Sequence, residues 1–184
     1  MARDNLRLGS IGLFPRDWAE AYYPPDLPED WAFDFYANEQ PVALLTPAEL
    51  DARCTVHGAA DWVELLAELQ NDDFRLWLDL RHAPAPAAGA LRALGEGLEG
   101  IVGEAPQGFS GAPHWREEAC WSAQRPQCSG PGLLRLSGDE SPRELRTLLE
   151  SFDRACALEA PVLFVEAPRA AFETLQTLIE LMGL

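Results

Sequence analysis

Short apolar, strand-like runs alternate along this chain with segments whose apolar residues recur at helical spacing. The clearest strand prediction covers residues 160–165 (APVLFV), which are wholly apolar, include β-branched valines and are bracketed by prolines, as expected of a strand buried on both faces. Residues 74–80 (FRLWLDL) alternate apolar and polar side chains and predict another strand, with Trp77 and Asp79 on one face. Strands and helices that alternate at intervals of roughly 25–30 residues predict a parallel sheet with crossover helices.

The most clearly predicted helix begins at Ser141. A serine cap, Pro142 in the first turn and Glu144 three residues after the cap precede apolar residues at helical spacing. The same periodicity predicts helices at 62–69, 91–98 and 172–182. Further strands are predicted at 6–13, 41–45, 100–102, 119–123 and 132–136, and loops at 83–90 and 106–132.

Chain length limits the architectures that fit this order of elements. Both an open doubly wound sheet and a closed or incomplete barrel are built from alternating strands and helices. A full eight-unit barrel usually needs about 250 residues. The 184 residues therefore predict a single α/β domain, residues 1–184, with a short or incomplete TIM-barrel-like parallel β/α fold. The alternative is an open doubly wound parallel sheet.

Charge composition excludes several classes of function. The chain has 14 arginines, no lysine and 30 acidic residues, and its formal net charge is −16. Without lysine it forms no Schiff base and lacks the phosphate-loop lysine. An acidic surface repels nucleic acid and anionic membranes, so neither is expected as a partner. The absence of a long apolar run or C-x-x-C spacing predicts a cytoplasmic protein with free thiols.

The N-terminal quarter carries a series of short motifs in a fixed order. These are a glycine-bounded strand at 8–12 (LGSIG), Trp18, YYP at 22–24, LP at 27–28 and FYA at 35–37. Over roughly residues 6–46 this order resembles the opening of the YecE-like family of uncharacterised bacterial barrel proteins. The resemblance implies a TIM-barrel-like α/β fold, and it implies little about activity.

Two departures from that family concern the ends of strands. The family's second strand typically ends in Val-Glu-Ile-Asn before an aromatic pair, whereas residues 43–46 here are ALLT and the acidic residue and aromatic pair are missing. Asp79 stands where the third strand usually carries lysine. Because barrel folds keep their chemistry at the C-terminal ends of strands, these departures predict a divergent member whose ancestral site has been remodelled or abandoned.

Polar residues nevertheless follow several predicted strands. Asp79, Arg81 and His82 follow one, Glu104 follows another, and Glu166 ends the last. In a parallel α/β sheet these positions open onto one edge. Asp79, Glu104 and Glu166 are therefore candidate catalytic acid–base residues, and together with His82 they are candidate ligands of a hard divalent cation. The alternative interpretation is structural: Asp79 pairs with a nearby arginine, and Glu166 caps the next helix.

Three arginines are candidate ligands for an anion, since a planar guanidinium matches phosphate geometry: Arg16, Arg81 and Arg169. A weaker zinc hypothesis groups His114, Cys120 and Cys128 in one predicted loop.

A dense aromatic cluster near the N-terminus predicts a satellite core, with a ligand cleft or partner surface as the alternative. Its members are Phe14, Trp18, Tyr22, Tyr23, Trp31, Phe33, Phe35 and Tyr36.

The sequence leaves three functional hypotheses open. The first is a protein without an intact catalytic motif or cofactor, which binds a small molecule or a protein. The second is a metal-assisted hydrolase or isomerase of a small phosphorylated or anionic compound, which requires a divalent metal. The third is a subunit of a homo-oligomer, in which a second copy covers the edge strands that an incomplete barrel leaves exposed.

Overall fold

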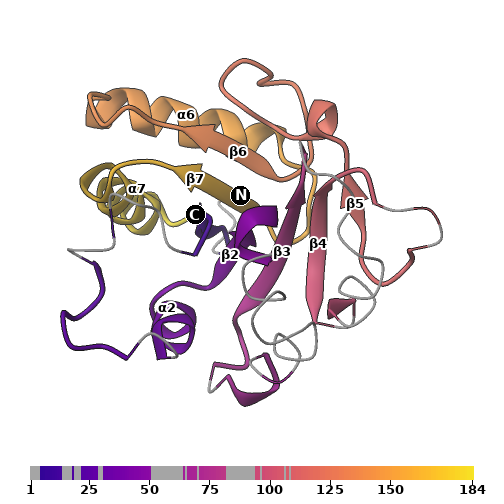
Figure 1. The fold of residues 1–184 in the computed structure, drawn as a ribbon. Helices are drawn as coiled ribbons and strands as arrows, with labels where there is room; N and C mark the ends of the chain where they lie inside the picture. Colours follow the sequence, from indigo (N-terminus) through magenta and orange to yellow (C-terminus); the bar gives the residue numbers. More distant parts are fainter. Residues whose placement is uncertain are drawn as a thin grey trace.

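In the part of the chain that the structure describes, seven strands run parallel in one sheet, in the order β5-β4-β3-β2-β1-β7-β6 (Figure 1). The strands are β1 (Arg7–Ile11), β2 (Val42–Leu45), β3 (Arg75–Leu80), β4 (Leu98–Gly103), β5 (His114–Trp115), β6 (Gly132–Arg135) and β7 (Val162–Glu166). The helices whose bounds lie within the described residues are α2 (Ala32–Glu39), the 3₁₀ helix η2 (Glu117–Ala119), α6 (Pro142–Ala155) and α7 (Arg169–Met182). The computed structural model describes residues 5–13, 18, 22–28, 31–50, 64, 66–69, 71–81, 94–95, 97–105, 107 and 109–184.

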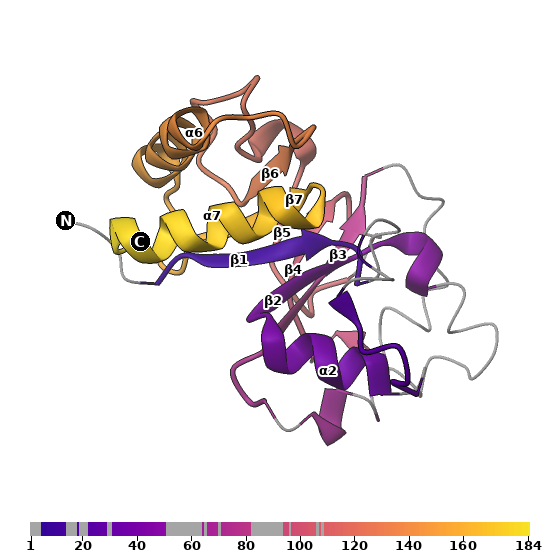
Figure 2. The same ribbon diagram turned by 90° about the vertical axis from the view of Figure 1, so that its left-hand side faces the viewer.

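The strand order distinguishes a barrel-like winding from a doubly wound one. Strands β1 to β5 follow one another across the sheet, and β7, the last strand, returns to pair with β1 on its other side. In a doubly wound sheet the second half would continue outward from β1 in chain order, so that β6 would lie closer to β1 than β7. The return of the last strand to the first confirms the predicted short TIM-barrel-like fold. The sheet is curled into a half-barrel (Figures 1 and 2).

The curl encloses an interior core on the concave face. Trp77 of β3 and Phe164 of β7 are separated in the sheet by β2 and β1, yet their ring centroids lie 5.4 Å apart. Trp77 also stacks on Trp115 of β5, with ring centroids 5.0 Å apart. The buried members of this interior core are Val42, Leu44, Trp77, Val102, Cys120, Leu133, Val162 and Phe164. As in a barrel, side chains fill the space that the strands enclose.

Helices cover the convex face. Residues of α6 and α7 pack on the outer side chains of β6, β7 and β1, whereas α2 packs on those of β2 and β3 (Figure 2). The predicted capping box begins α6: the Ser141 side chain accepts a hydrogen bond from the Glu144 amide, and the Glu144 carboxylate accepts one from the Ser141 amide. At the other end of the chain, Gly183 ends α7 in the left-handed conformation, at φ 65°.

One end of the interior is closed by a polar cluster at the beginning of the strands. The Arg7 guanidinium lies 2.6 Å from the Glu99 carboxylate, and the Trp77 indole donates a 2.7 Å hydrogen bond to the same carboxylate. A bulge between β3 and β4 accompanies this arrangement. These groups close the interior at the N-terminal ends of the strands.

Three of the sequence predictions are corrected by the structure. Leu98, predicted to lie on a helix, is the first residue of β4. The segment 119–123 is not a strand, since η2 ends at Ala119 and only isolated bridges follow at Trp121 and Ser122. Within the predicted loop 106–132, His114 and Trp115 pair with β4 as β5. The predicted loop 83–90 lies outside the described residues.

The chain itself covers part of the gap between β5 and β6. Trp121 bridges to Gly132 in parallel orientation, through hydrogen bonds from the Trp121 amide to Pro131 and from the Leu133 amide to Trp121. At this point, therefore, β6 does not need a second copy of the chain to satisfy its edge. Among the described residues, no helix combines the length and the apolarity required to cross a membrane.

Candidate functional site

A cavity of about 380 Å³ lies at the C-terminal edge of the sheet. Its walls come from the ends of β1, β6 and β7, from the residue after β3, and from the segment between η2 and β6. The lining residues are Ile11, Arg81, Glu117, Ser122, Ala123, Gln124, Arg125, Leu133, Leu134, Arg135 and Glu166. Three arginines and two glutamates therefore meet around a floor that is partly aliphatic.

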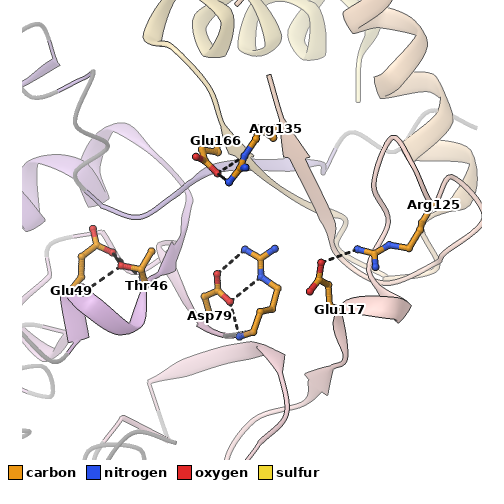
Figure 3. Close-up of polar contacts among 8 residues, drawn as sticks. Thr46, Glu49, Asp79, Glu117, Arg125, Arg135 and Glu166 are labelled. Carbon is orange, nitrogen blue, oxygen red and sulfur yellow. Dashed lines mark hydrogen bonds and ion pairs between the residues drawn. The ribbon is translucent and has the colours of Figure 1, made fainter. Parts of the chain in front are cut away.

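Asp79 and Arg81 form the most enclosed ion pair at this edge (Figure 3). Asp79 Oδ1 accepts hydrogen bonds of 3.0 Å from both the amide and Nε of Arg81, and Oδ2 accepts one of 2.7 Å from Nη2. The side chains are only 11% and 17% exposed. The hydrogen bond to Asp79 raises the pKa of the Arg81 guanidinium above its ordinary value. Because each oxygen of the Asp79 carboxylate accepts a hydrogen bond from the Arg81 guanidinium, this guanidinium is fixed at the cavity wall.

Arg135 and Glu166 form a second pair, at the ends of β6 and β7 (Figure 3). They are directly opposite each other in the strand register. Nε and Nη2 of Arg135 both donate to Oε2 of Glu166, at 2.9 and 2.6 Å. The sequence offered helix capping as an alternative role for Glu166. That role is not observed, since Pro168 is the N-cap residue of α7 and Glu166 pairs across the sheet instead.

Arg125 and Glu117 form the third pair, with 3.3 Å between Nη2 and Oε1 (Figure 3). Glu117 lies on η2, and its negative charge also raises the pKa of Arg81. Nε of Arg125 is buried, without a hydrogen-bond partner among the described residues. Both residues fall in the segment predicted to be a loop, and neither belongs to a recognisable motif. Their approach to Arg81 depends on long-range contacts, which no local sequence pattern records.

Other sequence candidates lie away from the cavity. Glu104 is exposed and pairs with the equally exposed Arg116, at 3.4 Å. Arg169 pairs with Glu173 one helical turn further along α7, at 2.6 Å, and lies over the Tyr22 ring at 5.7 Å from its centroid. Arg16 and His82 lie outside the described residues. Of the anion-binding candidates that the structure describes, only Arg81 lines the cavity.

The residues of the zinc hypothesis, His114, Cys120 and Cys128, do not form a metal site in the structure. Cys120 is buried in the interior core, and burial raises the pKa of its thiol to about 12. Cys128 instead donates a 2.9 Å hydrogen bond to the carbonyl of Glu118, and His114 is exposed on β5. Among the described residues, His, Cys, Asp and Glu side chains form no group of three that is placed to hold a metal ion.

A polar network that the sequence reasoning missed joins the ends of β1 and β2 (Figure 3). The Glu49 carboxylate accepts hydrogen bonds from the Leu13 amide at 2.7 Å, the Thr46 amide at 2.9 Å and the Thr46 hydroxyl at 2.7 Å. Gly12 makes the turn beside it at φ +83°, which favours glycine. The spacing Thr46-x-x-Glu49 is that of a capping box and could have revealed this link. The network fixes two strand ends next to the cavity.

The aromatic cluster is mainly a packing feature. Trp18, Phe33 and Tyr36 are buried. Tyr22 makes edge-on ring contacts with Tyr23 and other members, between the side chains that pack under α6 and α7 and those that pack under α2. This supports the satellite-core interpretation for these residues, whereas Trp31 is 63% exposed and Phe14 lies outside the described residues.

Comparison with known proteins gives no functional assignment. The chain matches no protein-family model, no curated protein and no solved structure. The chemistry of the cavity is therefore the basis for a functional proposal. Three guanidinium groups, each oriented by a carboxylate, surround a space large enough for a small molecule.

Proposed function

We propose that the protein binds a small polar molecule with an anionic group in the cavity at the C-terminal edge of the sheet. The observation that carries this proposal is the convergence of Arg81, Arg125 and Arg135 on one cavity from three separate segments of the chain. The position also matches the edge at which parallel α/β sheets bind ligands.

Arginine suits this role because its planar fork of N–H donors fits a carboxylate or a phosphate. In this cavity the guanidinium groups of Arg81 and Arg125 are already held in place by Asp79 and Glu117. Preorganised donors lose less conformational entropy when a ligand binds, which increases affinity. The aliphatic floor, formed by Ile11 and Leu133 among others, provides a surface for the less polar part of the molecule.

Binding fits the geometry better than catalysis by the strand-end carboxylates. A general acid or base needs an oxygen within hydrogen-bond reach of the substrate. Both oxygens of Asp79 are engaged by Arg81, and Oε2 of Glu166 accepts both hydrogen bonds from Arg135. Glu104 does not line the cavity at all. The Asp79 carboxylate is therefore better placed to orient Arg81 than to transfer a proton.

The proposal is tested by a thermal-shift screen of the full chain against small anionic metabolites and neutral analogues, at constant ionic strength. We expect stabilisation by one or more anionic compounds, with the effect lost in Arg125→Gln and Arg135→Gln. Arg146→Gln is the matched control, because Arg146 forms an exposed ion pair on α6 that does not contribute to the cavity. Equal stabilisation of all four proteins would contradict binding in this cavity.

We also propose that the chain is a divergent, cytoplasmic member of the YecE-like family. The half-barrel sheet supports the family assignment, and so does the position of the shared motifs, since FYA at 35–37 lies in α2 directly before β2. At Gly9 of the first motif, a Cβ atom would collide with the carbonyl oxygen of Val42. The free thiols of Cys120 and Cys128 favour a reducing compartment. Cell fractionation tests the location, and superposition of an experimental structure on a YecE-like barrel tests the family.

A further inference from the structure

The two arginine–carboxylate pairs at the strand ends differ in how the carboxylate is held. Both oxygens of Asp79 accept hydrogen bonds from the Arg81 guanidinium, and Oδ1 also accepts one from the Arg81 amide. Glu166 presents one oxygen, Oε2, to both donors of Arg135, and Oε1 makes no hydrogen bond with any described residue. The Asp79 pair is nearly buried, whereas the Arg135 and Glu166 side chains are 80% and 50% exposed.

We propose that Glu166 is an internal competitor, which occupies Arg135 in the free protein and is displaced by a carboxylate or phosphate group of the ligand. This inference rests on the proposed function, because it assigns the anionic group of the ligand to Arg135. It also assigns the two strand-end carboxylates different roles: Asp79 permanently orients Arg81, and Glu166 competes for the ligand's position.

The geometry makes the exchange favourable. A ligand carboxylate or phosphate can place two oxygens on Nε and Nη2 of Arg135, in the bidentate arrangement that Glu166 does not adopt. Glu166 is the last residue of β7 and its side chain is half exposed, so the displaced carboxylate turns into water without leaving a buried charge. Displacing the Asp79 carboxylate from Arg81 would instead leave a nearly buried negative charge that has lost its hydrogen bonds from the Arg81 guanidinium.

The effect of removing the competitor follows from the strength of such a pair. Exposed ion pairs change an equilibrium by a factor of up to about five. Glu166→Gln removes the negative charge and retains the size of the side chain. We therefore expect this variant to bind small anions roughly twofold to fivefold more tightly than the original protein.

The matched control is Glu150→Gln. Glu150 also pairs with an arginine through one carboxylate oxygen, at 2.8 Å, and its side chain is 43% exposed, close to the value for Glu166. It lies on α6 and does not line the cavity. The control changes the net charge by the same amount, so it separates local competition from the general repulsion of anions by an acidic protein.

The experiment titrates the full chain and the variants Glu166→Gln, Glu150→Gln and Arg135→Gln with sodium acetate and with sodium phosphate. Ionic strength is held constant with sodium chloride, and the arginine Nε–H signals are followed by NMR. Tighter binding of either probe to Glu166→Gln alone, with loss of binding in Arg135→Gln, supports the inference. The probe that responds identifies the anionic group as carboxylate or phosphate.

Two results would overturn the inference and leave the proposed function standing. One is binding to Glu166→Gln that is no tighter than to the original protein, while Arg135→Gln still abolishes it. The other is an equal gain in affinity for Glu166→Gln and Glu150→Gln. If neither probe binds saturably to any of these proteins, both the inference and anion binding in this cavity are wrong.

Discussion

Replacement of Gly100 by alanine is expected to destabilise the protein, because Gly100 faces the Trp77 indole in the interior core. A Cβ atom at position 100 would lie 2.5 Å from Cζ3, 2.6 Å from Cε3 and 2.8 Å from Cη2 of that ring. These distances are too short for carbon atoms, so the indole would have to move. It is confined on two sides, by the stacked Trp115 ring and by Phe164.

Overpacking of a filled core typically costs about 1–3 kcal/mol. For a chain of this size, each kcal/mol lowers Tm by about 2–4 °C. Gly100→Ala is therefore expected to lower Tm by about 2–12 °C. Gly97→Ala is the matched control, because the new Cβ would come closer than ordinary contact only to the flexible end of Leu66, and its expected effect is within about 0.5 kcal/mol.

The assay is a double-mutant cycle with Trp77→Phe, measured by chemical denaturation of all four proteins. A phenyl ring is shorter than an indole and ends before the positions of Cζ3 and Cη2. The cost of Gly100→Ala should therefore fall by at least about 1 kcal/mol in the Trp77→Phe background. If Gly100→Ala is as stable as the original protein, or if the two substitutions are additive, then Trp77 does not fill the interior as described.

Three further outcomes test other parts of the account. Ser141→Ala should lower the unfolding free energy by about 1 kcal/mol in chemical denaturation, since it removes the cap of α6; an unchanged midpoint would contradict the capping box. Hydrogen bonds from the Ser137 amide and hydroxyl lower the pKa of Glu140, so their stabilisation is present above its ordinary pKa of 4.5 and is lost as pH falls through the lowered folded value. Glu140→Gln should therefore reduce the loss of Tm between pH 7 and pH values below 4.5, and an acid response identical to that of the original protein would refute this role. Iodoacetamide at neutral pH should label Cys128 before Cys120, whose thiol is buried with its pKa raised to about 12, and mass spectrometry showing the reverse order would contradict the burial of Cys120.

Local sequence signals account for the elements that were predicted well. The cap, proline and glutamate at 141–144 specify the start of α6 through contacts within one helical turn. The wholly apolar run at 160–165 predicted β7, because a strand between two neighbours and under helices needs apolar side chains on both faces. The alternation at 74–80 placed Trp77 and Asp79 on one face of β3, since side chains in a strand alternate.

The elements that were missed depend on contacts that no local pattern records. β5 has only two residues, and pairing with β4 rather than any strand-like run defines it. Leu98 fits a helical period with earlier leucines, but the pairing of residues 98–103 with β3 makes it a strand residue. In this case tertiary pairing overrides the helical periodicity.

The composition of the cavity was predictable only in part. Asp79, Arg81 and Glu166 were placed at the C-terminal edge by their position after strands, a rule that holds for any parallel sheet. Arg135 was not singled out, because its pairing with Glu166 follows from the register between β6 and β7, which α6 separates in the sequence. Glu117 and Arg125 come from a segment without a local signature. Arg169, although it follows β7, points to Glu173 and Tyr22 instead.

The most direct test of the account is a crystal structure of the protein soaked in sodium selenate, with the anion located by anomalous scattering from selenium. We expect a half-barrel sheet in the order β5-β4-β3-β2-β1-β7-β6, with selenate oxygens about 2.7–2.9 Å from the Arg135 guanidinium and the Glu166 carboxylate turned away from it. Selenate bound elsewhere on the surface, with the cavity free of it and Glu166 still on Arg135, would contradict the proposed site.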